Sequence, residues 1–164
     1  MDERFELYYN LLKEWNEKFN LTAITEKDKI ELLHFKDSIL PEDLIKQNAT
    51  VLDIGSGAGF PAIPLKIVRD DLDITMVDSL NKRVTFLNEV ISKLNLERAK
   101  AVHKRAEDLD KNVKYDVVTA ICESRCSDES VVRVLYSVRK KRWDYACIQK
   151  RRRRRRIKSG SKSN

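Results

Sequence analysis

The sequence predicts an α/β fold in which a parallel sheet follows an N-terminal helical extension. Three observations predict it: apolar residues at helical spacing near the start, short β-branched runs that alternate with amphipathic segments, and a glycine-rich turn after the first of these runs. Strands that alternate with helices form parallel sheets with right-handed crossovers. At 164 residues, the chain has room for one domain.

The N-terminal part is predicted to be helical. Residues 2–19 form the first expected helix, because their large apolar side chains recur every three or four positions. A second helix is expected from Thr25, whose hydroxyl can cap it, through Phe35. We interpret both apolar stripes as core, so residues 1–40 form a helical cap that Pro41 separates from the rest.

Residues 41–120 are expected to form the sheet and its crossover helices. Strands are predicted where short runs are apolar and β-branched, and helices where apolar residues recur at helical spacing. The expected strands are residues 49–54, 73–78, 99–102 and 115–119, and the expected helices run from Pro61 to Val68 and from Ser79 to Leu94. The sheet is then expected to stop, truncated on its C-terminal side.

A glycine-rich turn, residues 55–59, stands between the first strand and its helix, where parallel-sheet proteins bind ligands. Its G-S-G-A-G spacing lacks the last glycine of the dinucleotide fingerprint, and no Lys-Ser or Lys-Thr follows as a P-loop requires. Asp78 ends the next strand, where a carboxylate can accept hydrogen bonds from both ribose hydroxyls. A ligand with a ribose and an adenine but no pyrophosphate fits best. The alternative is a tight turn that binds nothing.

Other polar residues complete the list of candidates. The segment from Arg105 to Asp108 follows the third strand at the same edge of the sheet, where it can border an adenine or form a solvated loop. His34 and His103 are isolated from other metal-ligating residue types. We therefore predict no metal site, and a structural or surface role for each histidine.

Six stretches of the sequence resemble the class I S-adenosylmethionine-dependent methyltransferases and, within them, the glucose-inhibited division protein B family (RsmG) of bacterial ribosomal RNA methyltransferases. W-N-E-K-F-N-L-T-A-I-T and H-F-K-D-S-I-L are particular to that family, whereas the glycine turn identifies only the superfamily. The resemblance covers about residues 5–120, and its stretches begin at Trp15, His34, Val51, Val77, Arg105 and Tyr115.

The resemblance implies a Rossmann-like class I methyltransferase fold, S-adenosyl-L-methionine as cofactor, and methylation of a guanine on ring nitrogen seven in small-subunit ribosomal RNA. That nitrogen exposes a lone pair, so the transfer needs alignment rather than a strong base, and no catalytic residue is predicted. The resemblance also assigns cofactor-binding residues: Gly55 and Phe60 at the methionine end, Asp78, Ser79 and Leu80 at the ribose, and Ala106 and Glu107 at the adenine.

Charge divides the chain into two parts. Its 33 Lys and Arg exceed its 26 Asp and Glu, but residues 121–164 hold 15 basic and 4 acidic residues, so the first 120 residues are net acidic. The three cysteines are all in the basic part, and an odd number favours a reducing compartment. No apolar run is long enough to cross a bilayer and no secretory signal is present, so we expect a cytoplasmic monomer that contacts no membrane.

Residues 121–164 depart from the family pattern. Ile121 stands where the family has an Arg that contacts the cofactor, and the segment contains six consecutive arginines. Our hypothesis is that codons from about Ile121 onward are read out of frame. Permitted codons for residues 122–126 can yield Ala-Arg-Ala-Val-Ala in a shifted frame, which resembles the family's missing segment and includes its Arg. Sequencing the gene tests this. The chain is then a truncated or inactive form. The alternative is a native, disordered basic tail that binds RNA phosphates, making the protein a nucleic-acid-binding module without catalysis.

Overall fold

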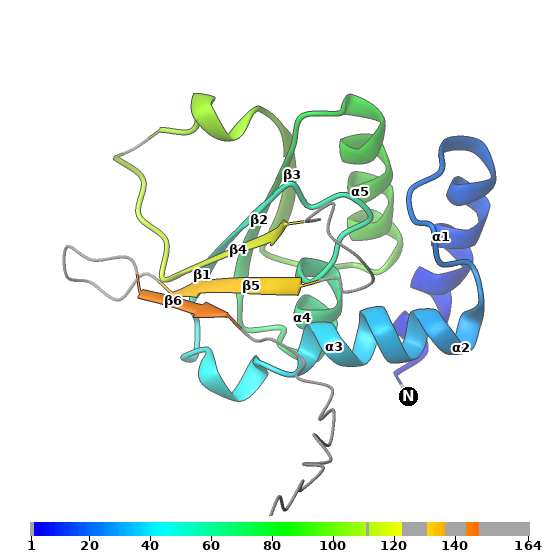
Figure 1. Ribbon diagram of the computed structural model, residues 1–164, viewed down its shortest axis with the longest axis horizontal. Coiled ribbons are helices and arrows are strands. Elements are labelled where there is room, and N and C mark those ends of the chain that lie inside the picture. The colour runs from blue at the N-terminus through cyan, green and yellow to red at the C-terminus, as the bar shows by residue number, and fades with distance from the viewer. Residues whose placement is uncertain (1, 111, 123–130, 137–143, 148–164) are drawn as a thin grey trace, which may run out of the picture.

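The computed structural model describes residues 2–110, 112–122, 131–136 and 144–147, with side chains described through Ala120. Six strands form one sheet in the order β3-β2-β1-β4-β5-β6 (Figure 1). Four of them pair in parallel and the last two are antiparallel. The strands are β1 (Thr50–Ile54), β2 (Asp73–Asp78), β3 (Ala99–His103), β4 (Val117–Cys122), β5 (Val131–Tyr136) and β6 (Asp144–Cys147).

This sheet confirms the predicted α/β class and the parallel arrangement of the first four strands. It does not stop at β4, however, because β5 and β6 continue it in antiparallel pairing. The hydrophobic, β-branched run of residues 131–136 explains why this segment can pair as a strand. Two predictions concern the tail, namely that it is read out of frame and that it is disordered. Both fall mainly on residues 123–130, 137–143 and 148–164, which lie outside the described residues.

The first helix, α1 (Glu3–Phe19), confirms the predicted helix to within one residue. The carboxylate of Asp2 caps it by accepting a hydrogen bond from the backbone N–H of Arg4 at 2.8 Å, and Asn20 ends it in the left-handed conformation. Its buried face carries Phe5, Tyr8, Leu11 and Leu12.

The second helical segment is α2 (Lys27–Ile30), a π-helical stretch η1 (Glu31–Lys36) and α3 (Asp37–Ile39) in succession. The predicted start at Thr25 was wrong. The backbone is still extended at Glu26, so Thr25 lies too far from the first turn to cap it, and no side chain caps this helix. The remaining helices are η2 (Glu42–Leu44), α4 (Ala62–Val68), α5 (Asn81–Lys93) and η3 (Ala106–Asp108).

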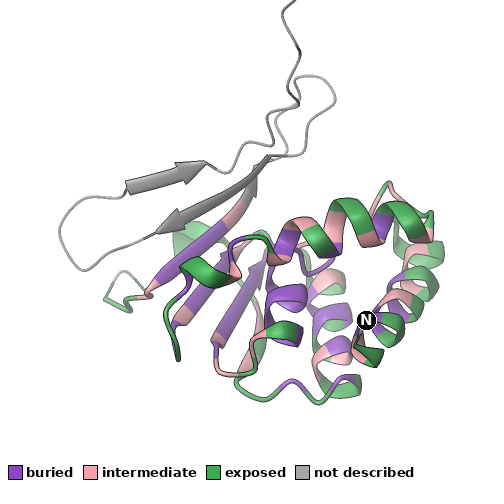
Figure 2. Ribbon diagram, turned by 90° about the horizontal axis from the view of Figure 1, so that it is seen from below, coloured by how far each residue is buried: buried purple, intermediate pink, exposed green. Residues whose placement is uncertain are grey.

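The long helices gather on one face of the sheet in two layers (Figures 1 and 2). Helices α4 and α5 lie directly against the strands, while α1 packs on both of them and α3 on α4. The main hydrophobic core fills the space between these layers, and a smaller cluster of Leu52, Val77 and Val118 lies on the opposite face of the sheet. Within the described residues, no helix is long and apolar enough to span a bilayer.

Candidate functional site

The glycine turn lies at the carboxyl edge of the sheet, where β1, β2, β3 and β4 all end. The backbone N–H groups of Gly55 and Ser56 both donate to the carbonyl oxygen of Val77, at 2.8 and 3.2 Å. Gly55, Gly57 and Gly59 have φ angles of 71°, 58° and 96°. Such positive values favour glycine, so the glycine spacing noted in the sequence is required by the shape of this turn.

Asp78 holds the glycine turn and the start of α5 together. Its carboxylate is buried, and its Oδ2 and Oδ1 accept hydrogen bonds from the backbone N–H groups of Gly57 and Leu80, each at 2.9 Å. Arg83 approaches the same carboxylate, with its Nη1 at 3.6 Å from Oδ2. Each carboxylate oxygen retains acceptor capacity for a ligand hydroxyl.

The other predicted residues lie along the same edge. The carbonyl oxygen of Ser79 is 3.0 Å from Nε2 of His103, and the backbone N–H of Lys104 donates to the carbonyl oxygen of Asp78 at 3.2 Å. These contacts join the end of β3 to the segment after β2. Ala106 and Glu107 follow in η3 and are exposed. The structure thus brings together the turn and residues 78–80, and η3 begins two residues after Lys104, just past the end of β3.

Phe60 is buried in an aromatic cluster beneath the turn. Its ring stacks on that of His34, with centroids 4.4 Å apart and planes inclined by 10°, and also meets the rings of Tyr8 and Phe35. Thr22 contributes a hydroxyl 3.4 Å from Nε2 of His34. The Phe60 side chain is thus part of the core, which leaves its backbone as the part that can line a ligand.

Asp53 is the residue that the sequence interpretation missed. It is fully buried on β1, and its Oδ1 accepts a hydrogen bond from the Thr119 hydroxyl at 2.6 Å. Its Oδ2 has no hydrogen-bond partner among the described residues. The pKa of Asp53 is raised to about 7, chiefly by burial; hydrogen bonds from the Thr119 and Ser56 hydroxyls lower it, and the nearby Asp78 raises it. The available signal was a charged residue between Leu52 and Ile54 in an apolar strand.

These features fit an adenosyl ligand with a cationic end. The glycine turn allows close approach of the backbone, Asp78 offers acceptors for ribose hydroxyls, and Asp53 has a buried carboxyl oxygen without a partner. An unpartnered buried oxygen is costly in a folded protein, so the Oδ2 atom of Asp53 is a candidate contact for a bound ligand.

The raised pKa of Asp53 predicts how stability changes with pH. The folded chain keeps this proton up to about pH 7, whereas an unfolded chain loses it near 3.8, so the group stabilises the fold below pH 4 and this contribution is lost as pH rises toward 8. The loss is at most about 4 kcal/mol. We expect Asp53→Asn to be more stable than wild type at pH 8 but not at pH 4, as measured by urea unfolding. Equal stability at pH 8 would contradict this prediction.

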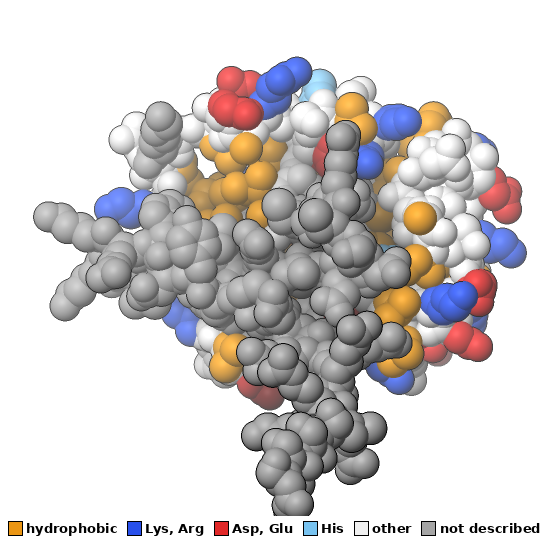
Figure 3. Space-filling view, in the orientation of Figure 1, with side chains coloured by type: hydrophobic (Ala, Val, Ile, Leu, Met, Phe, Trp, Pro, Cys, Tyr) orange, Lys and Arg blue, Asp and Glu red, His pale blue; other side chains and the backbone are white. Residues whose placement is uncertain are grey.

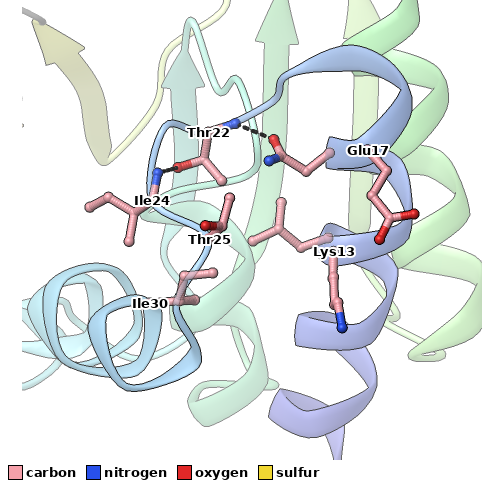
Figure 4. Close-up of a pocket in the computed structure, with 8 residues that line it drawn as sticks. Lys13, Glu17, Thr22, Ile24, Thr25 and Ile30 are labelled. Carbon is pink, nitrogen blue, oxygen red and sulfur yellow. Dashed lines mark hydrogen bonds between the residues drawn. The ribbon is translucent and has the colours of Figure 1, made fainter.

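A separate pocket lies in the helical cap. It has a volume of about 260 Å³ and opens between α1 and the segment from Thr22 to Thr25 (Figure 4). Leu12, Ile24 and Ile30 line it, with Lys13 and Glu17 on the side of α1. Its lining includes no residue of the glycine turn, so we place the candidate site at the sheet edge and not in this pocket.

Comparison with solved structures supports the fold. The chain is similar to coclaurine N-methyltransferase bound to N-methylheliamine and SAH, with a TM-score of 0.52 and 17% sequence identity. The superposition covers 70% of this chain and 34% of that one. It shows the Rossmann-like methyltransferase fold that the sequence predicts.

Sequence comparison identifies the family. The chain is 55% identical over 108 residues to ribosomal RNA small subunit methyltransferase G of Clostridium perfringens, covering 65% of this chain and 45% of that protein. It is 51% identical over 128 residues to the protein of the same name from Staphylococcus haemolyticus, covering 75% and 53%. The chain thus spans about half the length of these relatives. Because the model of the GidB family, rRNA small subunit methyltransferase G, matches residues 1–135, the chain belongs to that family.

Proposed function

We propose that this chain binds S-adenosyl-L-methionine at the carboxyl edge of the sheet. Asp78 accepts hydrogen bonds from the ribose hydroxyls, while Ser79 and Leu80 border the ribose. The turn at Gly55 and the backbone of Phe60 line the methionine end. The adenine lies against η3, at Ala106 and Glu107. The observation that carries this proposal is the buried Asp78 carboxylate, which two backbone N–H groups hold at the end of β2.

We further propose that the complete protein methylates ring nitrogen seven of a guanine in small-subunit ribosomal RNA. The bound cofactor supplies an electrophilic methyl group on a sulfonium. The residues of this chain fix the position of that group, because the backbone of the glycine turn and the Asp78 carboxylate are already ordered. An aromatic ring nitrogen with a free lone pair needs this alignment more than it needs a base. The relatives named ribosomal RNA methyltransferases support this assignment.

Two experiments test the proposed function. The first is calorimetric titration of the 164-residue chain with S-adenosylmethionine and S-adenosylhomocysteine, for which we expect one site per chain. The second uses a chimera that joins residues 1–120 to the C-terminal half of the Clostridium perfringens relative, because this chain spans only part of that protein. We expect the chimera to form 7-methylguanosine in small ribosomal subunits that lack the modification.

The controls distinguish a failure to bind the cofactor from a failure to modify the RNA substrate. The chimera carrying Asp78→Ala should lose methyl transfer through lost cofactor binding, which the same titration measures. A folded chain that binds neither ligand would contradict the cofactor proposal. A chimera that binds the cofactor but leaves guanine unmodified would contradict the substrate proposal alone.

Other features of the whole protein stay predictions. These are a monomeric state, a cytoplasmic location and the lack of a metal. The nucleic-acid-binding alternative depends on the arginine-rich residues 148–164, which lie outside the described residues. In the described surface of Figure 3, basic and acidic side chains are interspersed.

A further inference from the structure

The peptide unit that joins Ala58 to Gly59 is held at both of its polar ends. Its carbonyl oxygen accepts a hydrogen bond from the Tyr8 hydroxyl of α1, and its N–H donates to the carbonyl oxygen of Ser56 at 2.7 Å. Ala58 is buried, so water does not readily replace a lost partner at this carbonyl. The peptide unit therefore cannot rotate without giving up a buried hydrogen bond.

The Tyr8 ring is itself fixed in place. The side chain is fully buried, its ring is stacked on that of Phe35 with centroids 5.4 Å apart, and it meets the ring of Phe60 at 5.7 Å. A Cβ atom at Gly59 would lie 2.9 Å from the Tyr8 hydroxyl oxygen, so a glycine at this position leaves the space that the hydroxyl occupies. A confined aromatic ring thus presents its hydroxyl to the turn at one position.

Tyr8 holds a different part of the glycine turn from the part that β2 holds. Val77 and Asp78 accept hydrogen bonds from backbone N–H groups of residues 55–57. Tyr8 contacts the second half of the turn, and it comes from α1, which precedes the whole sheet in the sequence. Among the described residues, it is the only side chain of α1 that hydrogen-bonds to the turn. The half of the turn that leads into Phe60 is therefore oriented from the helical cap.

Resting on the proposed cofactor site, we propose that Tyr8 is a positioning residue, whose hydroxyl holds the peptide unit between Ala58 and Gly59 in the orientation that the methionine end of the cofactor needs. Tyr8 acts through the turn and does not touch the ligand, because its side chain is fully buried beneath the turn. A binding loop that already has its bound shape gives higher affinity, since less ordering is left for the binding step.

A positioning role and a purely structural role have different effects on affinity. A contact that is equally strong in the ligand-free and ligand-bound protein contributes to stability and leaves the dissociation constant unchanged. A contact whose loss lets the turn reorganise in the ligand-free protein weakens binding, because only the fraction of molecules with the right turn binds. Without the Tyr8 hydroxyl, the buried Ala58 carbonyl lacks its donor, and this favours such a reorganisation.

The first test is ligand binding by Tyr8→Phe in the full chain, a substitution that removes the hydroxyl and keeps the ring. Titration calorimetry with S-adenosylmethionine and S-adenosylhomocysteine should give dissociation constants about tenfold higher than those of wild type. Urea unfolding of the same variant measures its stability separately. Wild-type affinity in a folded Tyr8→Phe protein overturns the proposal, whatever its stability.

The second test is amide hydrogen exchange in the ligand-free chain, measured by NMR. Rotation of the peptide unit would break the hydrogen bond from the N–H of Gly59 to Ser56, so exchange at Gly59 should be about tenfold faster in Tyr8→Phe. The N–H of Gly55, which donates to Val77 in β2, is the internal reference for global opening. Equal acceleration at Gly55 and Gly59 overturns the proposal, because it indicates a loss of overall stability alone.

Tyr9→Phe is the matched control, since it removes the same hydroxyl from the next residue of α1. Tyr9 is half-buried, and its ring lies against Lys27, with Nζ 5.4 Å from the ring centroid. We expect this variant to keep wild-type affinity and wild-type exchange at Gly59. A tenfold loss of affinity in Tyr9→Phe as well overturns the assignment to Tyr8.

Two further outcomes are distinct. If Tyr8→Phe does not fold, the carbonyl carbon-13 shift of Ala58 in the wild type decides. It should show the hydrogen-bonded value with and without ligand, and a value reached only with ligand overturns the proposal. If the folded wild type binds neither ligand, the proposed cofactor site fails, and this inference fails with it.

Discussion

Asp78→Ala should weaken S-adenosylmethionine binding by about 100-fold. The substitution removes the acceptors proposed for the ribose hydroxyls, and it also leaves the backbone N–H groups of Gly57 and Leu80 without their partner. Hydrogen bonds to a charged group are each worth about 1.5–3 kcal/mol. Losing the two from the ribose hydroxyls therefore costs about 3 kcal/mol or more of binding free energy, which corresponds to about 100-fold or more in affinity. Titration calorimetry at constant pH measures this loss directly.

Asp108→Ala is the matched control for Asp78→Ala. Asp108 is an exposed carboxylate at the end of η3, on the same edge of the sheet, so its removal changes the local charge without removing a buried acceptor. We expect its affinity to remain within about threefold of wild type, because exposed charges interact weakly in water. A folded Asp78→Ala protein with unchanged affinity would exclude Asp78 from the binding site.

Gly59→Ala should destabilise the protein by about 3 kcal/mol. A Cβ atom at Gly59 would lie 2.7 Å from Cγ1 of Ile63, 2.9 Å from the Tyr8 hydroxyl oxygen and 3.0 Å from Cδ2 of Leu87. The φ angle of 96° adds backbone strain for any residue with a side chain. Urea unfolding followed by circular dichroism measures the change in the free energy of unfolding.

Gly55→Ala separates crowding from backbone strain. Gly55 also has a positive φ, 71°, but a Cβ there would have no atom within 4 Å. We expect it to cost about 1 kcal/mol, the strain contribution alone. If both variants lose the same free energy of unfolding, crowding against Ile63, Tyr8 and Leu87 does not limit substitution at Gly59.

Local patterns predicted most of the fold up to β4. Helical spacing of apolar residues located α1, α4 and α5, because burial on one side of a helix imposes that period. Continuous β-branched runs located β1 to β4, because strands such as β1 and β2 are buried on both faces of the sheet. The π-helical form of η1 had no such signal. It places Phe35 in the core and turns the His34 ring onto Phe60, which is a contact between segments distant in sequence.

The candidate site was predicted in part. Gly55 and Asp78 were found because their positions follow from the shape of a strand-turn-helix unit. Asp53 was missed, since its importance depends on full burial and on which hydroxyls reach it, and neither is visible in a single sequence. β5 was missed although its residues are β-branched, because the run lies in a segment interpreted as out of frame.

The hydrogen bond from the Tyr8 hydroxyl to the carbonyl oxygen of Ala58 joins the first helix to the glycine turn across 50 positions of sequence. Because Val77 and Asp78 of the second strand also fix the backbone of this turn, the turn is the point at which the helical cap and the sheet are joined. A substitution on the first helix can therefore alter the ligand turn without lying in it.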